Sequence, residues 1–555
     1  MSELKKEEVN QGQADRSYEA KGSPSRADGS PGRRSFLTQA GQFLLGSAAY
    51  GIVPPVISGC HVSPKLSFGG GGGKKADLSL TNPKKRKYLF VFSAMGGASI
   101  NDSFLAVRES ECDAKRRSTL NVYPDGLVRQ AEGTGPLGLR ALDFEMPTVG
   151  PLPFGIQTNQ SQFLGKYGKE IMVTTLTGNT VAHPVGQARC VNGFEAWNGR
   201  TLQEAVAAYY GQDLLLPNVN MATLGFAEHG KDPSLPRYAL AEQMANAALF
   251  PFGLDGSLGI NGAPKRSLIN IARRFRDDRL DAQSPFAQTY AKNPMVQEWI
   301  ERRKKLAEYE NRKLINLLNP YENSTKFDFK NFNLEPNPLG ELFRKLFKNV
   351  GPSSADRVTD DLENQTLLAY LLVASGLSCA VTFGLGMNVA VDVITDPNKK
   401  KLWNTPTGFD YSHNAHRGTQ ALLWQRTLDM IDRLITLLRS TEIGPGETLW
   451  DHSLIYVATE FGRDKTREAN VSEFTSGHNT NNGAVIISPL VNGGTVLGGI
   501  NFDDLMTYGF NPETGEPVKD SHMEYKHIYA GILQALGVDT TGSNLPNMKA
   551  MVKKS

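Results

Sequence analysis

The stretch SLIYVATEFGRDK, residues 453–465, contains the feature that decides the fold. Its first half, Leu454 to Ala458, is a run of apolar and β-branched residues, as expected for a strand that is covered on both faces of its sheet. The run ends abruptly at Thr459 and Glu460, so a carboxylate stands where a buried strand leaves the sheet. In α/β sheets the carboxyl ends of the strands are where ligands bind, and this Glu is therefore a candidate functional residue.

Four further runs have the same character, and helical periodicity lies between them. The stretches 362–376 and 420–440 predict helices, the second with a stripe of Leu and Ile residues on one face. Alternating strands and helices predict an α/β fold, with a mostly parallel sheet and helices on both faces. We also expect a mainly helical insertion or cap over the sheet, 205–360, because 293–319 is rich in strong helix formers. The predicted strands are 88–94, 170–178, 377–386, 453–459 and 482–488.

Length and charge set broad limits. A chain of 555 residues can form two to four domains or one large α/β domain with insertions. Its 60 Lys and Arg against 57 Asp and Glu give a net charge of +3, which offers no electrostatic argument for binding nucleic acid or a membrane surface. The four Cys residues have no zinc-ligand spacing and indicate no disulfide framework.

The N-terminal region resembles an export signal. Residues 1–32 are polar and predict a disordered segment. Arg33 and Arg34, followed by a weakly apolar stretch, match the twin-arginine export pattern, and the end of the stretch 33–60 resembles a lipobox in which Cys60 is lipidated. Residues 61–87 then predict a flexible linker rich in Gly and Lys. We therefore expect the twin-arginine translocase to be a partner during export. We also expect the mature protein to be periplasmic or in the cell envelope, anchored to a membrane by lipid. The alternative is an ordinary signal peptide with an incidental Cys.

Polar residues follow each predicted strand. Carboxylates and imidazoles at several strand ends have the composition of a site for a hard or borderline divalent metal ion. The Arg residues among them are candidate clamps for a phosphate or sulfate group, because a planar guanidinium matches their geometry. The residues, in strand order, are Ser99 and Asp102; Thr180, His183 and Arg189; Asp410 and His413; Glu460 and Arg463; and His478.

A family resemblance is carried by short motifs in a fixed order. The motifs are GGASINDSF (96–104), AHPVGQARCVNG (182–193), FDYSHN (409–414), ATEFGR (458–463) and GHNTNNGAVIISP (477–489). Together they resemble the family named domain of unknown function 1501, in the alkaline phosphatase-like superfamily, over residues 88–540, with 541–555 left as a tail. The resemblance implies an alkaline phosphatase-like core that holds one or two divalent metal ions and hydrolyses phosphate or sulfate esters.

The resemblance also implies roles for individual residues. The implied metal ligands are Asp102, Asp410, His413, Glu460 and His478, for Zn²⁺, Mn²⁺, Mg²⁺ or Ca²⁺. The candidate catalytic residues are Thr180, His183, Arg189 and Arg463, and Ser99 is a second candidate nucleophile beside Thr180. Two positions depart from the pattern, since Ala182 stands where some members have Ser and Phe461 stands where metal-binding phosphatases have His.

Three functions are consistent with these residues. The first is an exported metal-dependent hydrolase of phosphate or sulfate esters. The second is a catalytically degenerate binding or scaffold lipoprotein, for which Ala182 and Phe461 are the evidence. The third is an envelope-assembly factor. Structural alternatives also exist for single residues: an ion pair between Glu460 and Arg463, and an Asx-turn at Asp102.

Overall fold

The computed structural model describes most of the region after residue 85. The described residues are 86–131, 138–146, 156–244, 264–275, 284–290, 361–386, 388–391, 403–406 and 408–554, with a few shorter pieces between 247 and 318. The chain divides into the units 1–70 and 71–555, and all described residues belong to the second unit. The predicted export and lipidation residues, Arg33, Arg34 and Cys60, lie outside the described residues, as does most of the predicted helix 293–319.

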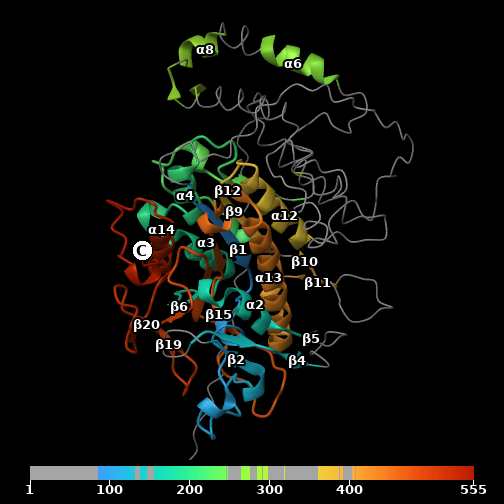
Figure 1. Ribbon diagram of the computed structural model, residues 1–555, viewed down its shortest axis with the longest axis vertical. Helices are drawn as coiled ribbons and strands as arrows, with labels where there is room; N and C mark the ends of the chain where they lie inside the picture. The colour runs from blue at the N-terminus through green and yellow to red at the C-terminus, as the bar shows by residue number, and fades with distance from the viewer. Residues whose placement is uncertain are drawn as a thin grey trace, which may run out of the picture. The chain divides into compact units, whose positions relative to one another are not determined.

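An eight-stranded sheet forms the centre of the fold (Figure 1). All five predicted strands belong to it, and β1 begins and ends where the sequence predicts. In spatial order the strands are β18 (Thr495–Leu497), β6 (Ile171–Thr177), β17 (Asn481–Ile487), β14 (Ser453–Ala458), β1 (Tyr88–Ala94), β9 (Ala380–Leu385), β7 (Asn218–Asn220) and β8 (Glu242–Gln243).

The sheet is mixed and mostly parallel, which confirms the predicted α/β class. The strand β17 is antiparallel to both of its neighbours, β14 and β6, whereas the other neighbouring pairs are parallel. The chain leaving β14 enters a short antiparallel ribbon, β15 (Gly462–Arg463) with β16 (His478–Asn479), and this ribbon returns it to the sheet in the opposite direction. The amino end of β17 therefore lies at the edge where the parallel strands have their carboxyl ends.

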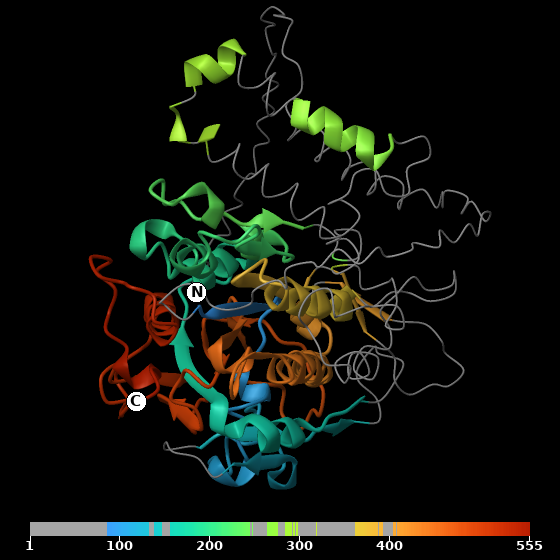
Figure 2. The ribbon, with the colours of Figure 1, turned by 45° about the horizontal axis from the view of Figure 1, so that its top comes forward.

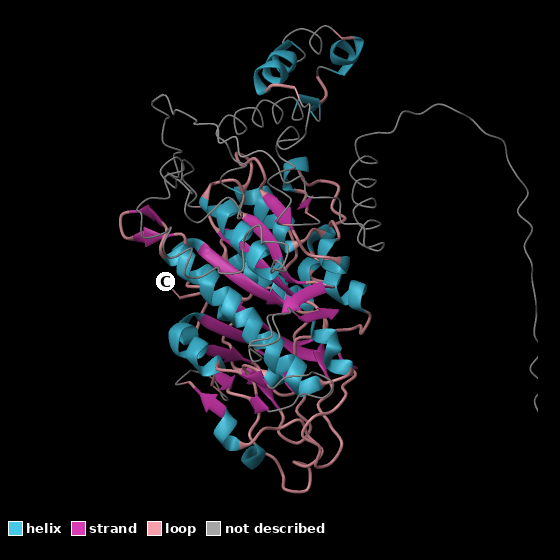
Figure 3. Ribbon diagram, turned by 90° about the vertical axis from the view of Figure 1, so that its right-hand side faces the viewer, coloured by secondary structure: helices cyan, strands magenta, loops and turns pink. Residues whose placement is uncertain are grey.

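Helices cover both faces of the sheet (Figures 1 to 3). On one face α12 (Asp361–Ala374) and α2 (Gln160–Tyr167) pack against α13 (His416–Arg439), and on the other α3 (His183–Asn192), α4 (Leu202–Tyr210) and α14 (Tyr525–Ala535) pack together. Every residue of β1, β9 and β14 is buried, which explains why these strands read as continuous apolar runs. Among the described residues, no helix combines the length and hydrophobicity that crossing a membrane requires.

Two predicted boundaries need correction. The range 205–360 begins within α4 (Leu202–Tyr210), and the strands β7 and β8 that follow extend the central sheet, so its first part belongs to the sheet domain rather than to a separate insertion. Further along this range the described α-helices include α6 (Arg266–Phe275) and α8 (Pro285–Tyr290). The predicted tail, 541–555, is packed onto the domain: Met548 and Met551 are fully buried, and Val552 forms a β-bridge with Val491.

Smaller strand pairs surround the central sheet. They are β2 (Val128–Gln130) with β3 (Arg140–Leu142), β4 (Glu145–Met146) with β5 (Ile156–Gln157), β10 (Asn388–Val391) with β11 (Trp403–Pro406), β12 (Glu442–Gly444) with β13 (Glu447–Thr448), and the three-stranded β19 (Gly499–Ile500), β20 (Thr507–Phe510) and β21 (Pro517–Val518).

Candidate metal centre

Three segments that are distant in sequence meet at one edge of the central sheet. The turn after β6 leads into α3, which begins at His183. A 3-10 helix, Gly408–His413, carries Asp410 and His413 and is followed almost at once by α13. His478 precedes the antiparallel strand β17 and reaches this edge because β17 runs in the reverse direction.

Three histidine rings converge on one carboxylate oxygen. The Nε2 atoms of His183, His413 and His478 lie 3.1, 3.2 and 3.2 Å from Oδ1 of Asp410. The Nε2 atoms of His413 and His478 are 2.8 Å apart. Ligand atoms of His183, Asp410 and His478 all lie within 4.8 Å of one another, and within the described ranges this is the one group of three such residues that could hold a metal ion.

The opposite ring nitrogens of two of these histidines are occupied. Nδ1 of His183 lies 2.7 Å from Oε1 of Glu460, and Nδ1 of His478 lies 3.1 Å from the backbone carbonyl oxygen of Val181. Both acceptors are suited to an N–H on Nδ1, which leaves Nε2 of each ring as the nitrogen that faces Asp410 and that could bind a metal ion. Metal-binding histidines in proteins have this second-layer arrangement, which sets both the tautomer and the ring orientation.

The protonation of the cluster follows from its contacts. Burial alone lowers the pKa of His183, but its hydrogen bonds to Asp410 and Glu460 outweigh burial and raise the pKa to about 9. Burial raises the pKa of Asp410, yet hydrogen bonds from His183, His478 and Arg463 hold it well below its usual range. Burial, and then the charge of Arg463, lower the pKa of His413. Without a metal ion, a positive charge on His183 thus lies between two carboxylates, where a bound cation would replace the proton.

Glu460 lies behind His183 and not among the converging ligand atoms. Its side chain is fully buried. Besides His183, Oε1 accepts hydrogen bonds from the backbone N–H of Gly96 at 2.9 Å and from Nε2 of Gln187 at 3.2 Å, whereas Oε2 is buried without a partner. Glu460, predicted as a ligand, thus contacts the cluster through the ring of His183, while His183, predicted as a catalytic residue, is one of the residues that could hold a metal ion.

Arg463 is also fully buried, and its guanidinium is engaged within the protein. It donates to Oδ1 of Asp410 at 2.7 Å and to the backbone oxygens of Gly96, Phe409 and Ser476. In the β15–β16 ribbon it pairs directly with His478. The expectation that Arg463 clamps a substrate is corrected, because its N–H groups bind oxygen atoms of three loops of the protein itself. The alternative of a Glu460–Arg463 ion pair is also not observed, since the carboxylate that Arg463 contacts is Asp410.

Asp102 belongs to a different buried group. Its Oδ1 accepts hydrogen bonds from Nδ2 of Asn121 at 2.8 Å, from the hydroxyl of Tyr123, and from the ring of His416, whose Nε2 is 3.1 Å away. The loop after β1 directs Asp102 toward the start of α13 rather than toward the converging histidines. Asp102 therefore has none of the hydrogen-bond partners of Asp410, and it is not part of the group His183, Asp410 and His478.

The remaining predicted residues contact neither the histidines nor Asp410 by hydrogen bonds. The Thr180 hydroxyl accepts from the backbone N–H of Ala182 at 3.1 Å. Arg189 donates to Asn179 at 2.7 Å, and its guanidinium lies 4.3 Å from the ring centroid of Phe194. Ser99 is fully buried beside Asp102.

Two residues that support the cluster were not predicted in that role. Gln187, one helical turn after His183 on α3, holds Glu460; its spacing of four residues is the signal that would have found it. The ring centroid of Phe461 lies 4.2 Å from that of His478 and 4.9 Å from that of His183, so this side chain forms a wall of the site. Gly97, with φ of +82°, leaves room for this wall, because a Cβ there would lie 2.9 Å from the Phe461 ring.

No protein-family model matches the sequence, and no curated protein matches it significantly. The fold and the site alone define the class: an α/β protein with a mixed, mostly parallel central sheet and a candidate histidine and carboxylate metal centre at one edge of it.

Proposed function

We propose that the protein is an exported, metal-dependent hydrolase of phosphate or sulfate esters. One observation carries the proposal: three imidazole Nε2 atoms converge on Oδ1 of Asp410, and two of the rings have their Nδ1 atoms occupied by Glu460 and by the Val181 carbonyl. The motif-based resemblance to alkaline phosphatase-like proteins supplies the expected substrate class.

The donor set fits a borderline metal ion better than a hard one. His183, His413, His478 and Asp410 would hold the ion with three nitrogen donors and one oxygen donor, which suits Zn²⁺ or Mn²⁺, whereas Mg²⁺ and Ca²⁺ prefer oxygen donors throughout. When bound, such an ion would polarise an ester oxygen and lower the pKa of water. The side chain of His413 is 43% exposed and that of His478 is 19% exposed, so the cluster is accessible to a substrate from solvent.

The protein's own residues would orient the centre. Glu460 fixes the ring of His183, and Arg463 fixes the carboxylate of Asp410, so both ligands are held from behind by fully buried side chains. Because the hydroxyls of Thr180 and Ser99 are engaged elsewhere, water is the nucleophile that this arrangement favours over a covalent route through Ser or Thr.

Metal analysis followed by an ester assay tests the proposal. Protein purified from its native compartment is analysed for metals and assayed on phosphate monoesters, phosphate diesters and sulfate esters. We expect about one Zn²⁺ or Mn²⁺ per chain or more, hydrolysis of one ester class, and loss of both in His478→Gln. Wild-type protein that neither contains nor takes up a divalent metal ion contradicts the proposal.

A second candidate, a binding or scaffold lipoprotein, is favoured by a specific observation. The guanidinium of Arg463 contacts Asp410 at 2.7 Å and Nε2 of His413 at 3.3 Å from a fully buried position, and Arg189 contacts Asn179 and Phe194, so both Arg residues are already engaged within the protein and neither is available to neutralise a substrate anion. In this case the metal ion would stabilise the protein. Metal uptake with no hydrolysis of any ester, and with a large loss of thermal stability in His478→Gln, would support the scaffold instead.

A further inference from the structure

The helix α6, Arg266–Phe275, exposes an apolar face. Leu268, Ile271 and Phe275 are 58%, 55% and 53% exposed, and they are among the most exposed large hydrophobic side chains of the described residues. At about 100° per residue these three positions fall on one stripe of the helix, with Ala272 beside them. Exposed apolar stripes of this kind on a soluble surface mark an interaction site.

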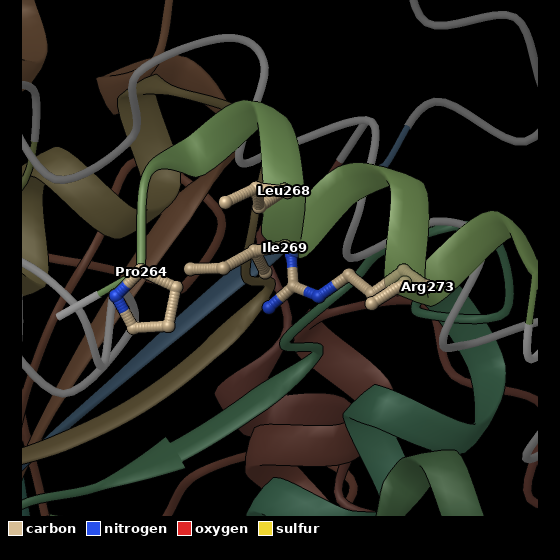
Figure 4. Close-up of a pocket in the computed structure, with 5 residues that line it drawn as sticks. Pro264, Leu268, Ile269 and Arg273 are labelled. Atoms are coloured by element: carbon tan, nitrogen blue, oxygen red, sulfur yellow. The ribbon is translucent and has the colours of Figure 1, made fainter.

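Basic residues flank the stripe. The stretch 264–275, PKRSLINIARRF, contains Lys265, Arg266, Arg273 and Arg274 and no Asp or Glu, although the whole chain has a net charge of only +3. On the helical wheel Lys265 and Arg273 fall on one side of the stripe and Arg274 on the other. A shallow hollow on the first of these sides is lined by Pro264, Leu268, Ile269, Ala272 and Arg273 (Figure 4).

We propose that α6 is a membrane-surface site that binds an anionic lipid bilayer with its axis in the plane of the interface. Its apolar stripe would enter the boundary between headgroups and acyl chains, and the flanking Lys and Arg residues would contact anionic headgroups. The helix has ten residues and is about 15 Å long, half the thickness of a hydrocarbon core, so it lies on the bilayer and does not span it.

The charge distinguishes this partner from a second copy of the chain. If two α6 stripes packed against each other, the basic residues beside them, Lys265 and Arg274, would be brought close to those of the other copy, and the stretch 264–275 contains no acidic residue. An anionic bilayer carries negative headgroups that would attract these basic residues, and directly beneath the headgroups it has an apolar layer for the stripe. Three half-exposed side chains bind reversibly, so the site would orient the domain on a membrane rather than anchor it irreversibly.

Hydrogen exchange with and without vesicles tests the proposal directly. The full chain is mixed with vesicles of phosphatidylcholine alone, or of phosphatidylcholine with 30% phosphatidylglycerol, and exchange of backbone amides is followed by mass spectrometry. We expect anionic vesicles to slow exchange across 266–275, and zwitterionic vesicles to slow it much less. Unchanged exchange over this stretch when the protein is vesicle-bound overturns the proposal.

Matched variants test which side chains are responsible. L268Q/I271Q/F275Q should lower partition onto anionic vesicles about tenfold or more and remove the protection of 266–275, since it removes the apolar stripe but keeps good helix formers. K265Q/R274Q should lower partition about 25-fold, or about fivefold for each charge, on anionic vesicles only. L240Q/M506Q/V518Q alters three apolar residues elsewhere that are 36%, 37% and 40% exposed, and it should change nothing.

Two outcomes would overturn the assignment of α6 to a membrane. In one, the triple α6 variant and the control triple variant bind vesicles as well as the wild type does. In the other, the wild type is dimeric in solution, does not bind vesicles, and becomes monomeric in the triple α6 variant, which would assign the stripe to a second copy of the chain.

Discussion

Replacing Glu460 by Gln separates metal binding from folding. The carboxylate accepts a hydrogen bond from Nδ1 of His183, and this bond orients the ring whose Nε2 faces Asp410. Gln has nearly the same shape and retains one acceptor oxygen, but it removes the negative charge behind the ring. We therefore expect Glu460→Gln to weaken metal binding more than it weakens the fold.

The contacts of Glu460 set the magnitude. Loss of a carboxylate that orients a metal-binding histidine lowers metal affinity about 10- to 100-fold, which corresponds to roughly 1.4 to 2.8 kcal/mol. The amide oxygen of Gln still accepts from the Gly96 N–H and from Gln187, which now bind Oε1 at 2.9 and 3.2 Å. The free energy of unfolding of the metal-free protein should therefore fall by only about 1 kcal/mol, the contribution of a single hydrogen bond.

Two measurements on the same proteins give these quantities. Zn²⁺ affinity is measured by competition with a chromophoric chelator, and the free energy of unfolding by denaturant titration after metal removal. Asp102→Asn is the matched control, because Asp102 is an equally buried carboxylate that contacts His416 instead of the cluster. Asp102→Asn weakens the hydrogen bonds that Oδ1 accepts from Asn121 and Tyr123 and should lower stability by about 1 to 3 kcal/mol, while Zn²⁺ affinity of the folded protein changes little.

The reverse pattern would refute the reasoning. If Glu460→Gln binds Zn²⁺ as tightly as the wild type while Asp102→Asn loses affinity by tenfold or more, the metal ligands lie around Asp102. The converging histidines would then be a structural cluster held together by Asp410.

Three further predictions concern export, lipidation and pH. Replacing Arg33 and Arg34 by Lys should trap the precursor in the cytoplasm, because the translocase recognises the Arg pair and not its charge. Normal export of this variant, measured by cell fractionation, would contradict the twin-arginine assignment. Cys60→Ala should abolish incorporation of labelled fatty acid and release soluble protein, and continued labelling would exclude Cys60 as the lipidated residue. Burial lowers the pKa of Lys465 to about 8, although the charges of Asp102 and Asp464 act in the opposite direction. Because the unfolded chain then binds more protons than the folded one between pH 8 and pH 10.5, this residue should make stability rise over that window by on the order of 3 kcal/mol. Denaturant titrations at pH 7.5 and pH 9.5 should show a smaller rise in Lys465→Met than in the wild type, and equal slopes would rule out a depressed pKa for Lys465.

The sequence by itself determined the fold class and the strands that build the sheet. A strand buried on both faces must be apolar at successive positions, so β1, β6, β9, β14 and β17 are visible as continuous runs. The amphipathic stripe of α13 is visible for the same kind of reason. The short strands β7, β8 and β18 have only two or three residues each, and no periodicity can be recognised over such lengths.

The direction of β17 was decided only by the tertiary structure. The run 482–488 is equally apolar whichever way the strand points, and the β15–β16 ribbon reverses it. That reversal brings His478 to the edge where β14 ends, although the chain places it before a strand rather than after one. The sequence identified His478 as a candidate, but the reason that it reaches the site is topological.

The roles of the site residues also depended on the tertiary structure. The residue types indicated a metal site, and His183, Asp410, His413 and His478 do converge. A polar group at a strand end can face the site directly or contact it through another side chain. The difference depends on side-chain direction over a few ångströms, which cannot be read from the position of the residue in the sequence. For this reason Glu460, at the most conspicuous strand end in the chain, supports His183 from a fully buried position, whereas the ligand positions belong to residues in loops and at the ends of helices.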